Sequence, residues 1–164
     1  RMTRFNITLE ESIEMVLWAI ENAIGGEIFV PKIASYKIKD LADAIGPKCK
    51  KEISGIREGE KLHEEMITSA DSFNTFDIGN YYTILPANYD AKTHFKKINK
   101  NYTAVEEGFS YVSNKNKEFL SKETIRELIK LHVDTNFNPK KFFSKKINID
   151  HMVKTLLRVL ISKS

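Results

Sequence analysis

Four aliphatic residues recur at helical spacing near the start of the chain. They are Ile13, Val16, Leu17 and Ile20, and their spacing predicts a helix over residues 7–23. Thr8 and Glu11 have the spacing of a capping box, in which the first and fourth residues satisfy each other's free backbone N–H groups. The Gly-Gly pair at 25–26 is expected to end this helix.

Short strands and helices are predicted to alternate over the next forty or so residues. The segment EIFVPKI has the composition of a strand, and Pro31 places it at a strand end or a sheet edge. YKIKDLADAIG predicts a second helix that ends at Gly46, with an inner face of Leu41, Ala44 and Ile45. KKEISGI is expected to be a further strand that leads into GIREGEKLHEEM, residues 55–66, where a helix is predicted to begin near Glu58.

The pattern changes from about residue 67. NTFDIGNYYTILP suggests a strand or an extended arm, and the polar stretch that follows it is expected to be mostly irregular. SKETIRELIKLHV predicts a helix with Ser121 or Thr124 as its cap and an apolar face of Ile125, Leu128, Ile129 and Leu131. The alternation predicts an α/β fold with helices packed on a small mixed sheet. We expect one domain over residues 1–136 and a basic amphipathic helix or tail over 137–164.

Composition places the chain among ordinary globular proteins. It has 164 residues, of which 41% are hydrophobic and 29% are charged. The single cysteine, Cys49, cannot form an internal disulfide and suits a reducing compartment. No apolar run reaches the length of a membrane span and no signal peptide is seen, so a cytoplasmic location is expected.

The net charge of +4 is unevenly distributed. Residues 137–164 hold seven basic residues and one acid, which gives +6, so residues 1–136 carry −2. A basic stripe across the domain is therefore absent, and nucleic-acid binding is not expected of it. Three interpretations of the tail stay open: docking onto the domain or a partner subunit, contact with a membrane surface, and a nucleic-acid arm.

The segment GIREGEKLHEEM offers the main candidate chemistry, and two interpretations compete. In one, it is an ordinary solvated helix start, because Glu58 and Glu60 suit the positive end of a helix dipole. In the other, Arg57 and the free N–H groups of a helix N-terminus form a site for linked phosphates. Glu60 could then accept hydrogen bonds from the two hydroxyls of a ribose. Arg4 also precedes a predicted helix and is a weaker second candidate.

Other catalytic patterns are missing or unconvincing. The four histidines and Cys49 lack zinc-ligand spacing, so no metal site is expected. Tyr111 and Lys115 match the Tyr-x-x-x-Lys pair of short-chain dehydrogenases, but their polar surroundings argue against the helix that such a pair needs. The sequence contains no Gly-x-Gly-x-x-Gly, the fingerprint of a dinucleotide site. We therefore assign no catalytic residue to this chain.

Five sequence blocks nevertheless occur in the order and spacing of one family. They are RMTRFNITLEESIEMVL, GGEIFVPKIASYKIKDLADAI, GIREGEKLHEEMI, NYYTILP and EEGFSYVSNKNKEFLS. Through them the chain resembles, up to about residue 130, the C-terminal half of the inverting UDP-N-acetylglucosamine 4,6-dehydratases. These are bacterial polysaccharide-biosynthesis enzymes of the extended short-chain dehydrogenase/reductase class.

The resemblance implies a site and a missing partner. Arg57 and Glu60 would contact the diphosphate and ribose of a UDP-sugar, and Arg4 would add a second diphosphate contact. NADP and the catalytic Tyr and Lys would belong to an absent Rossmann half or companion chain, and the whole protein could be a homo-oligomer. An enzyme of that family is a lyase that oxidises C4 of the sugar, eliminates water across C5–C6 and returns the hydride to C6 with inversion at C5. Its product would feed the synthesis of pseudaminic-acid-type or capsular sugars.

Three positions depart from the family pattern. An aromatic residue is expected at Asn6, and prolines are expected at Ala34 and Glu58. A proline at 58 would preset the backbone that aims Arg57. Our leading interpretation is the substrate-binding part of a nucleotide-sugar dehydratase that is inactive without its Rossmann half. The alternative is a non-catalytic module that docks to a partner or an anionic membrane through its basic C-terminal helix.

Overall fold

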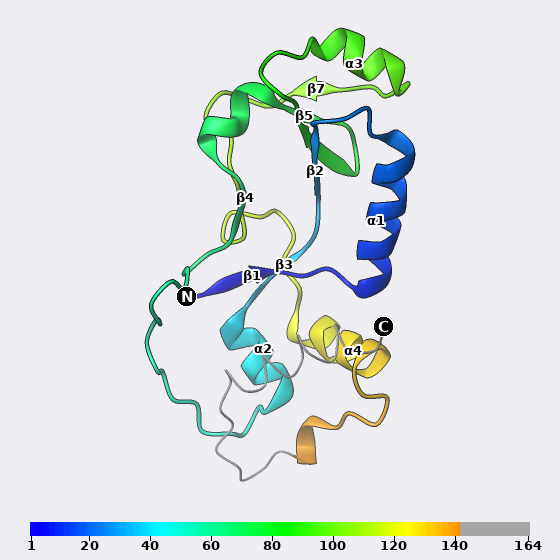
Figure 1. Cartoon of the computed structure of the whole chain (residues 1–164). Coiled ribbons are helices and arrows are strands. Elements are labelled where there is room, and N and C mark those ends of the chain that lie inside the picture. Colours follow the sequence, from blue (N-terminus) through cyan, green and yellow to red (C-terminus); the bar gives the residue numbers. More distant parts are fainter. Residues whose placement is uncertain (142–164) are drawn as a thin grey trace.

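The computed structural model describes residues 1–141 and has the predicted mixture of helices and strands (Figure 1). Its helices are α1 (Leu9–Asn22), α2 (Ile38–Ile45), α3 (Ala91–Lys97) and α4 (Lys122–His132), with short 3₁₀ helices η1 (Ser69–Asn74) and η2 (Pro139–Lys141). Its strands are β1 (Thr3–Phe5), β2 (Ile28–Pro31), β3 (Ser35–Lys37), β4 (Glu65–Ile67), β5 (Thr75–Asp77), β6 (Tyr81–Ile84), β7 (Thr103–Ala104) and β8 (Tyr111–Val112). Residues 142–164 lie outside the described part, and with them lies most of the predicted C-terminal helix.

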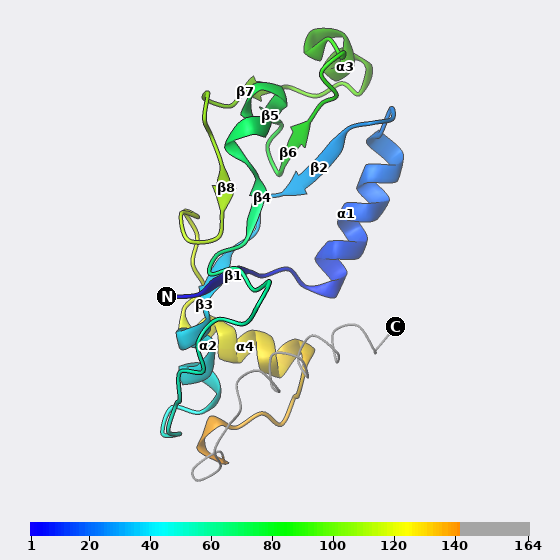
Figure 2. The same ribbon diagram turned by 60° about the vertical axis from the view of Figure 1, so that its left-hand side comes forward.

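The strands form small antiparallel sheets and not one mixed sheet. In the described part, β1 pairs with β3, β4 pairs with β8, and a four-stranded sheet has the order β2-β6-β5-β7. Pro31 ends β2, which is an edge strand of that sheet, as its missing N–H group predicted. The sheets and helices follow one another along an elongated body (Figures 1 and 2). The prediction of an α/β fold is confirmed at this level, while the single mixed sheet is wrong.

Helix α1 forms where the sequence predicted it. Thr8 is the N-cap, and both hydrogen bonds of the capping box with Glu11 are present. The helix attaches to the four-stranded sheet through Trp18, whose ring stacks on Tyr81 at 4.4 Å between centroids and meets the edge of Phe29 at 5.0 Å. None of its residues is buried.

Helices α2 and α4 pack together and form one core. Its buried members are Leu41, Ala44, Ile45, Ile125, Ile129 and Phe137. Gly46 is the C-cap of α2 and Ser121 is the N-cap of α4, as predicted. Leu131 was expected on the apolar face but is 73% exposed, because it follows the buried Ile129 by two positions and so projects from a different side of the helix.

Residues 50–64 differ most from expectation. Neither the strand predicted for KKEISGI nor the helix predicted near Glu58 is formed. Ile53 is 99% exposed and Ile56 is also exposed, so these two apolar side chains do not pack against a sheet. The backbone instead makes a tight turn in which Glu60 N donates to Arg57 O at 3.1 Å, with Gly59 at φ +74°. A positive φ at the third residue is what a type II turn requires.

The stretch after residue 67 is more ordered than the sequence suggested. NTFDIGNYYTILP forms the hairpin β5–β6, in which Phe76 lies opposite Thr83. Helix α3 was not predicted, although Asp90 is a good N-cap and accepts a hydrogen bond from Thr93 N. Phe95 on α3 is fully buried and stacks on Tyr102. This aromatic contact completes the end of the four-stranded sheet.

Candidate functional site

Arg4 lies on β1 and its side chain is only 19% exposed. Its Nη1 donates to the backbone carbonyl of Thr3 at 2.7 Å and to that of Leu62 at 3.3 Å. Nε lies 3.3 Å from Glu64 Oε1, and Nη2 lies 3.7 Å from Glu60 Oε1. The guanidinium is therefore held between β1 and the segment that carries the other predicted site residues.

Glu60 links the two candidate arginines. One of its carboxylate oxygens faces Arg4, and the other accepts a hydrogen bond from the backbone N–H of Arg57 at 3.2 Å. Arg57 is exposed and is the first residue of the turn. The fold thus brings the three predicted residues into one neighbourhood, although Arg4 is more than fifty positions from the other two.

The position of Arg57 corrects one step of the sequence argument. No helix begins at Glu58, so the phosphate-binding N–H groups of a helix N-terminus are not available there. The site must rely on the arginines and on turn geometry. A proline at 58 would occupy the second position of this turn, where its fixed φ is favourable.

A buried polar network holds the 60–64 segment against β1. Thr3 Oγ1 is 2.8 Å from His63 Nδ1 and 2.7 Å from Ser113 Oγ. The same Ser113 oxygen accepts from Glu64 N at 2.9 Å. Thr3 and Ser113 are almost fully buried. Unpaired buried polar groups are costly, so this network fixes the backbone beneath Arg4 and Glu60.

Sequence reasoning does not single out Glu64 or Thr3. Glu64 stands in a run of acids that resembles a solvated surface, and Thr3 is a short residue in a short strand. That Thr3 and Glu64 contact Arg4 becomes visible only in the structure, where β1 packs against the 60–64 segment.

Negative charge exceeds positive charge around Arg4. Two carboxylates, Glu60 and Glu64, face the single guanidinium. Tyr36, which lies opposite Arg4 across the β1–β3 pair, has its pKa raised by burial, and the positive charge of Arg4 partly opposes this shift. An anionic ligand at Arg4 would therefore compete with carboxylates that are already in place.

Two of the departures from the family pattern are neighbours. Asn6 N donates to Ala34 O at 2.8 Å, next to the β1–β3 pair that carries Arg4. The aromatic residue expected at position 6 and the proline expected at position 34 would therefore both lie where β1 and β3 meet.

Tyr111 has a structural environment. It lies on β8, its hydroxyl donates to Ile33 O at 2.9 Å, and it accepts from Ile33 N at 3.0 Å. Burial raises its pKa, and Lys115 follows in a turn. The expectation that residues 111–115 do not form a helix is confirmed.

Other features of the described part lie apart from this site. Among residues 1–141, no group of three His, Cys, Asp or Glu side chains is placed to hold a metal ion. A cavity of about 400 Å³ is lined by Lys130 and residues 135–140, none of which is a predicted site residue. None of the helices within this part combines the length and apolar character needed to cross a membrane.

Comparison with known proteins shows the class. Residues 1–86 match the polysaccharide biosynthesis protein family, and the chain belongs to that family. It is 44% identical over 133 residues to a UDP-N-acetylglucosamine 4,6-dehydratase (inverting) from Campylobacter jejuni, a match that covers 79% of this chain and 40% of the relative. The sequence resemblance to these dehydratases is thereby confirmed.

More distant relatives agree with this placement. A UDP-glucose 4-epimerase from Rickettsia bellii is 34% identical over 134 residues, covering 78% of this chain and 38% of the relative. The X-ray structure of Pen from Bacillus thuringiensis superposes with a TM-score of 0.63 at 28% identity, covering 78% of this chain and 38% of that one. The chain spans about 40% of the length of the curated dehydratases that it matches.

Proposed function

We propose that residues 1–136 are the substrate-binding part of a UDP-N-acetylglucosamine 4,6-dehydratase. The protein would serve bacterial surface-polysaccharide or pseudaminic-acid-type sugar synthesis in the cytoplasm. The observation that supports the proposal is the position of Glu60, whose carboxylate contacts the guanidinium of Arg4 and the backbone N–H of Arg57. The 44% identity to a dehydratase of that name supports the choice of substrate.

Each of the three residues has a distinct role in the proposal. Arg4 is the rigid contact, because two backbone carbonyls already fix its guanidinium toward the turn. Arg57, exposed at the start of the turn, closes onto the diphosphate from the other side. Glu60 exchanges its contact with Arg4 for the ribose hydroxyls, while the phosphates replace the lost negative charge beside Arg4.

The NADP of the proposed enzyme is not assigned to this chain. The sequence has no glycine fingerprint for a dinucleotide, so its residues do not fit that cofactor. We assign NADP, and the hydride chemistry that it supplies, to a Rossmann half or companion chain. This chain would bind and orient the sugar nucleotide and would be inactive by itself.

The test uses a chimera in which this chain replaces the matched 133 residues of the C. jejuni dehydratase. UDP is titrated into the chimera and its Arg57→Ala variant by calorimetry. We expect the variant to bind roughly 10- to 150-fold more weakly, the effect of losing a charge-assisted hydrogen bond. Lys61→Ala is the matched control, because it removes a neighbouring exposed positive charge without a proposed contact. Equal affinities of wild type and Arg57→Ala would contradict the assignment.

A further inference from the structure

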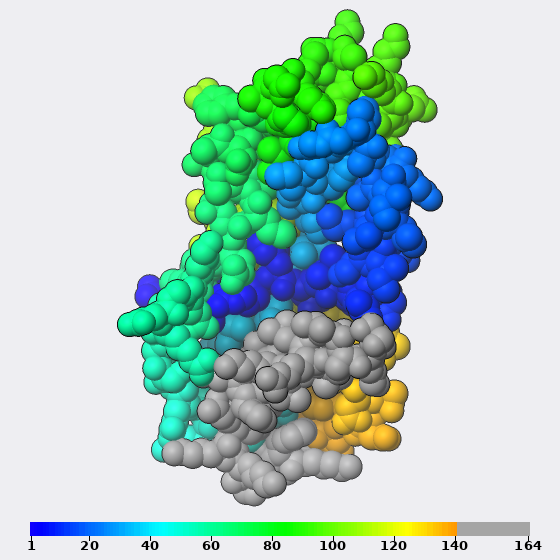
Figure 3. Space-filling model, in the orientation of Figure 1, coloured from blue at the N-terminus to red at the C-terminus, as the bar shows by residue number. Residues whose placement is uncertain are grey.

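His63 belongs to the segment that carries the proposed site, but its ring contacts β1 on the side away from Arg4. The segment around residues 55–65 lies against the N-terminal strand in the space-filling view (Figure 3). Successive side chains of a strand project to opposite faces, so Thr3 and Arg4 point to different sides of β1. His63 Nδ1 is 2.8 Å from Oγ1 of Thr3. The next residue, Glu64, meets Arg4 instead, with 3.3 Å between Oε1 and Nε, so the imidazole stands behind the guanidinium.

The hydrogen-bond chain that ends at His63 has one direction. Ser113 Oγ accepts from Glu64 N, and because Ser113 is fully buried its own hydrogen needs an acceptor. In the described part of the chain that acceptor is Thr3 Oγ1, at 2.7 Å. The hydrogen of Thr3 is then left for His63 Nδ1. The ring must therefore accept at Nδ1, which makes it a neutral imidazole with its hydrogen on Nε2.

A protonated His63 does not fit this chain. Both nitrogens of an imidazolium are donors, so Nδ1–H would point at Thr3, and Thr3 would turn its hydrogen to Ser113. The hydrogen of Ser113 would then have no acceptor in a fully buried place, which is unfavourable. The chain would fail at the atom that holds the backbone of Glu64.

The surrounding charges do not stabilise an imidazolium. The titratable groups of the elements around the ring are Arg4 on β1, Glu60, Lys61 and Glu64 on its own segment, and Tyr111 and Lys115 beside Ser113. The two carboxylates among them pair with Arg4. Within residues 1–141, no acid lies at ion-pair distance from His63. Its charged form has no compensating partner there.

We propose that His63 is a positioning residue of the diphosphate site, and that the site is fully formed only while its ring is neutral. This rests on the proposed function and adds a residue to it. Arg4 is held by the same two segments that the chain joins, through Thr3 O at 2.7 Å and Leu62 O at 3.3 Å. Protonation of His63 loosens that alignment and weakens the binding of linked phosphates. A positive charge acting only by attraction would strengthen it instead.

The first experiment measures by calorimetry the affinity of the chimera for UDP-N-acetylglucosamine between about pH 8 and pH 5.5, where histidine changes its charge. The linked phosphates of this ligand keep their charge over that range, whereas the terminal phosphate of UDP does not. We expect the affinity to fall roughly three- to tenfold on acidification. In His63→Asn it should stay level, because the amide oxygen accepts from Thr3 and is not protonated.

His132→Asn is the control for the pH profile. It removes a different histidine, on α4, that lies 3.5 Å from Glu10 and outside the proposed site. It should retain the wild-type fall in affinity. Tighter binding by wild type at low pH, or an unchanged fall in His63→Asn, would overturn the proposal.

A second experiment separates the acceptor from the volume of the side chain. At about pH 8, where the ring is neutral, His63→Leu and Thr3→Val should each weaken binding roughly three- to tenfold. The double variant should lose no more than either one alone, because both remove the same chain. His63→Asn should restore most of the affinity. Additive losses, or a loss that asparagine does not restore, would contradict the role of His63.

The third measurement needs neither a ligand nor the chimera. Nitrogen-15 chemical shifts of the His63 ring in the lone chain, residues 1–164 by themselves, show which nitrogen carries hydrogen. We expect Nδ1 without hydrogen at about pH 7.5, and a hydrogen on Nδ1 would overturn the proposal. If the wild-type chimera binds no sugar nucleotide at any pH, the proposed function fails and the role of His63 fails with it. Binding with a level pH profile overturns the role of His63 alone.

Discussion

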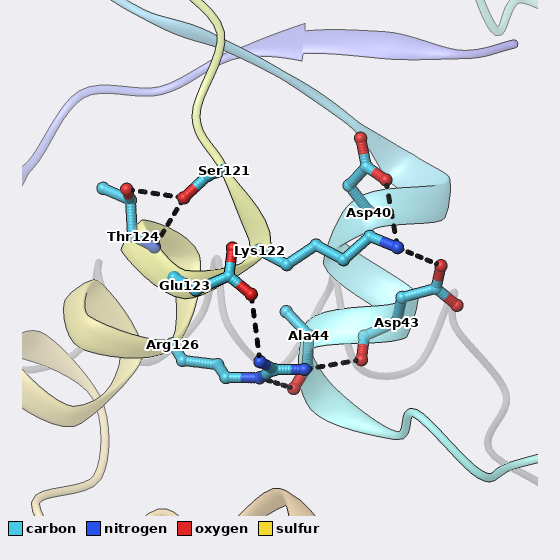
Figure 4. Close-up of polar contacts among 8 residues, drawn as sticks. All are labelled: Asp40, Asp43, Ala44, Ser121, Lys122, Glu123, Thr124 and Arg126. Carbon is cyan, nitrogen blue, oxygen red and sulfur yellow. Dashed lines mark hydrogen bonds and ion pairs between the residues drawn. The ribbon is translucent and has the colours of Figure 1, made fainter.

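Lys122 on α4 donates a hydrogen bond of 2.9 Å to Oδ2 of Asp43 on α2, across 79 positions of the sequence (Figure 4). Lys51 forms an ion pair with the other oxygen of the same carboxylate. Arg126 adds a hydrogen bond of 3.0 Å from Nε to Ala44 O. These contacts join the two helices and anchor the start of the irregular segment that leads to Arg57. Asp43 thus contacts both α4, through Lys122, and the start of the segment that carries the proposed site, through Lys51.

Replacing Asp43 with Asn should lower the unfolding free energy and remove part of its dependence on pH. Hydrogen bonds from Lys51 and then Lys122 lower the pKa of Asp43 below its ordinary 3.8. The folded state therefore favours the charged carboxylate, and this stabilisation is present above the ordinary pKa and is lost as pH falls through the lowered one. We expect a loss of about 1–2 kcal/mol at neutral pH. Urea unfolding between about pH 7 and pH 3, followed by Trp18 fluorescence, measures both effects.

The control for this prediction is Glu127→Gln, which changes an exposed carboxylate on α4. It should leave the curve of stability against pH parallel to that of wild type. The Asp43→Asn curve should instead approach wild type as the solution becomes acidic. If Asp43→Asn runs parallel to wild type across the whole range, the carboxylate does not contribute through its charge.

The fold was predictable where local signals and burial agree. Thr8 with Glu11, and Ser121, mark helix starts whose capping bonds are within a few residues, and both are formed. The segment 50–64 was not predictable, because its isoleucines suggest a strand while no neighbouring strand covers them. Gly55 and Gly59, both at positive φ, instead keep the backbone in turns.

The candidate site was predictable in its residues and not in its geometry. Arg57 and Glu60 belong to one short segment, so their proximity follows from the sequence. The contact of Arg4 with Glu60 requires the segment around Leu62 to pack beside β1, about sixty positions earlier in the chain. No local sequence pattern predicts such a long-range contact. The same holds for Glu64, which lies beside Arg4 only because the network through Ser113 holds it there.

Tyr111→Phe should lower stability without affecting nucleotide binding. The hydroxyl satisfies both backbone groups of Ile33, and Asn116 also donates to Ile33 O at 2.7 Å. The substitution therefore leaves Ile33 N without this partner in a partly buried place, at a cost of about 1–2 kcal/mol. Chemical denaturation of the lone chain measures the loss, and UDP titration into the chimera should give an unchanged affinity.

Lys115→Met separates this structural role from a catalytic one. Lys115 is exposed, so its replacement should change neither stability nor UDP affinity. If Tyr111→Phe and Lys115→Met each abolished turnover of the chimera while it stayed folded, the two residues would be acting as a catalytic pair and our interpretation would be wrong.

Glu58→Pro and Gly59→Ala should shift stability in opposite directions. Residue 58 is the second position of the Arg57–Glu60 turn, where proline restricts the unfolded chain and costs little in the folded one. We expect a gain of about 0.4–1 kcal/mol. Gly59 has φ +74° with no atom within 4 Å of an added Cβ, so alanine there has only the conformational penalty, about 1 kcal/mol. Thermal unfolding of the lone chain distinguishes the two, and destabilisation by Glu58→Pro would show that the turn differs from type II.

The last prediction separates the phosphate and ribose roles within the site. Glu60 and Glu64 both pair with Arg4, at 3.7 Å and 3.3 Å, but only Glu60 is proposed to meet the ribose. Inorganic pyrophosphate carries linked phosphates without a ribose, so the two ligands test different contacts. Glu64→Gln should strengthen binding of both pyrophosphate and UDP to the chimera by roughly two- to fivefold, because it removes a negative charge that competes for Arg4.

Glu60→Gln should behave differently with the two ligands. It should strengthen pyrophosphate binding to the same extent as Glu64→Gln, since the competing charge beside Arg4 is again removed. It should weaken UDP binding, because an amide oxygen is a poorer acceptor for the ribose hydroxyls than a carboxylate. Arg4→Ala should weaken both ligands roughly tenfold or more. Calorimetric titrations that show Glu60→Gln and Glu64→Gln shifting the ratio of the two affinities equally would remove Glu60 from the ribose and leave it as a partner of Arg4 alone.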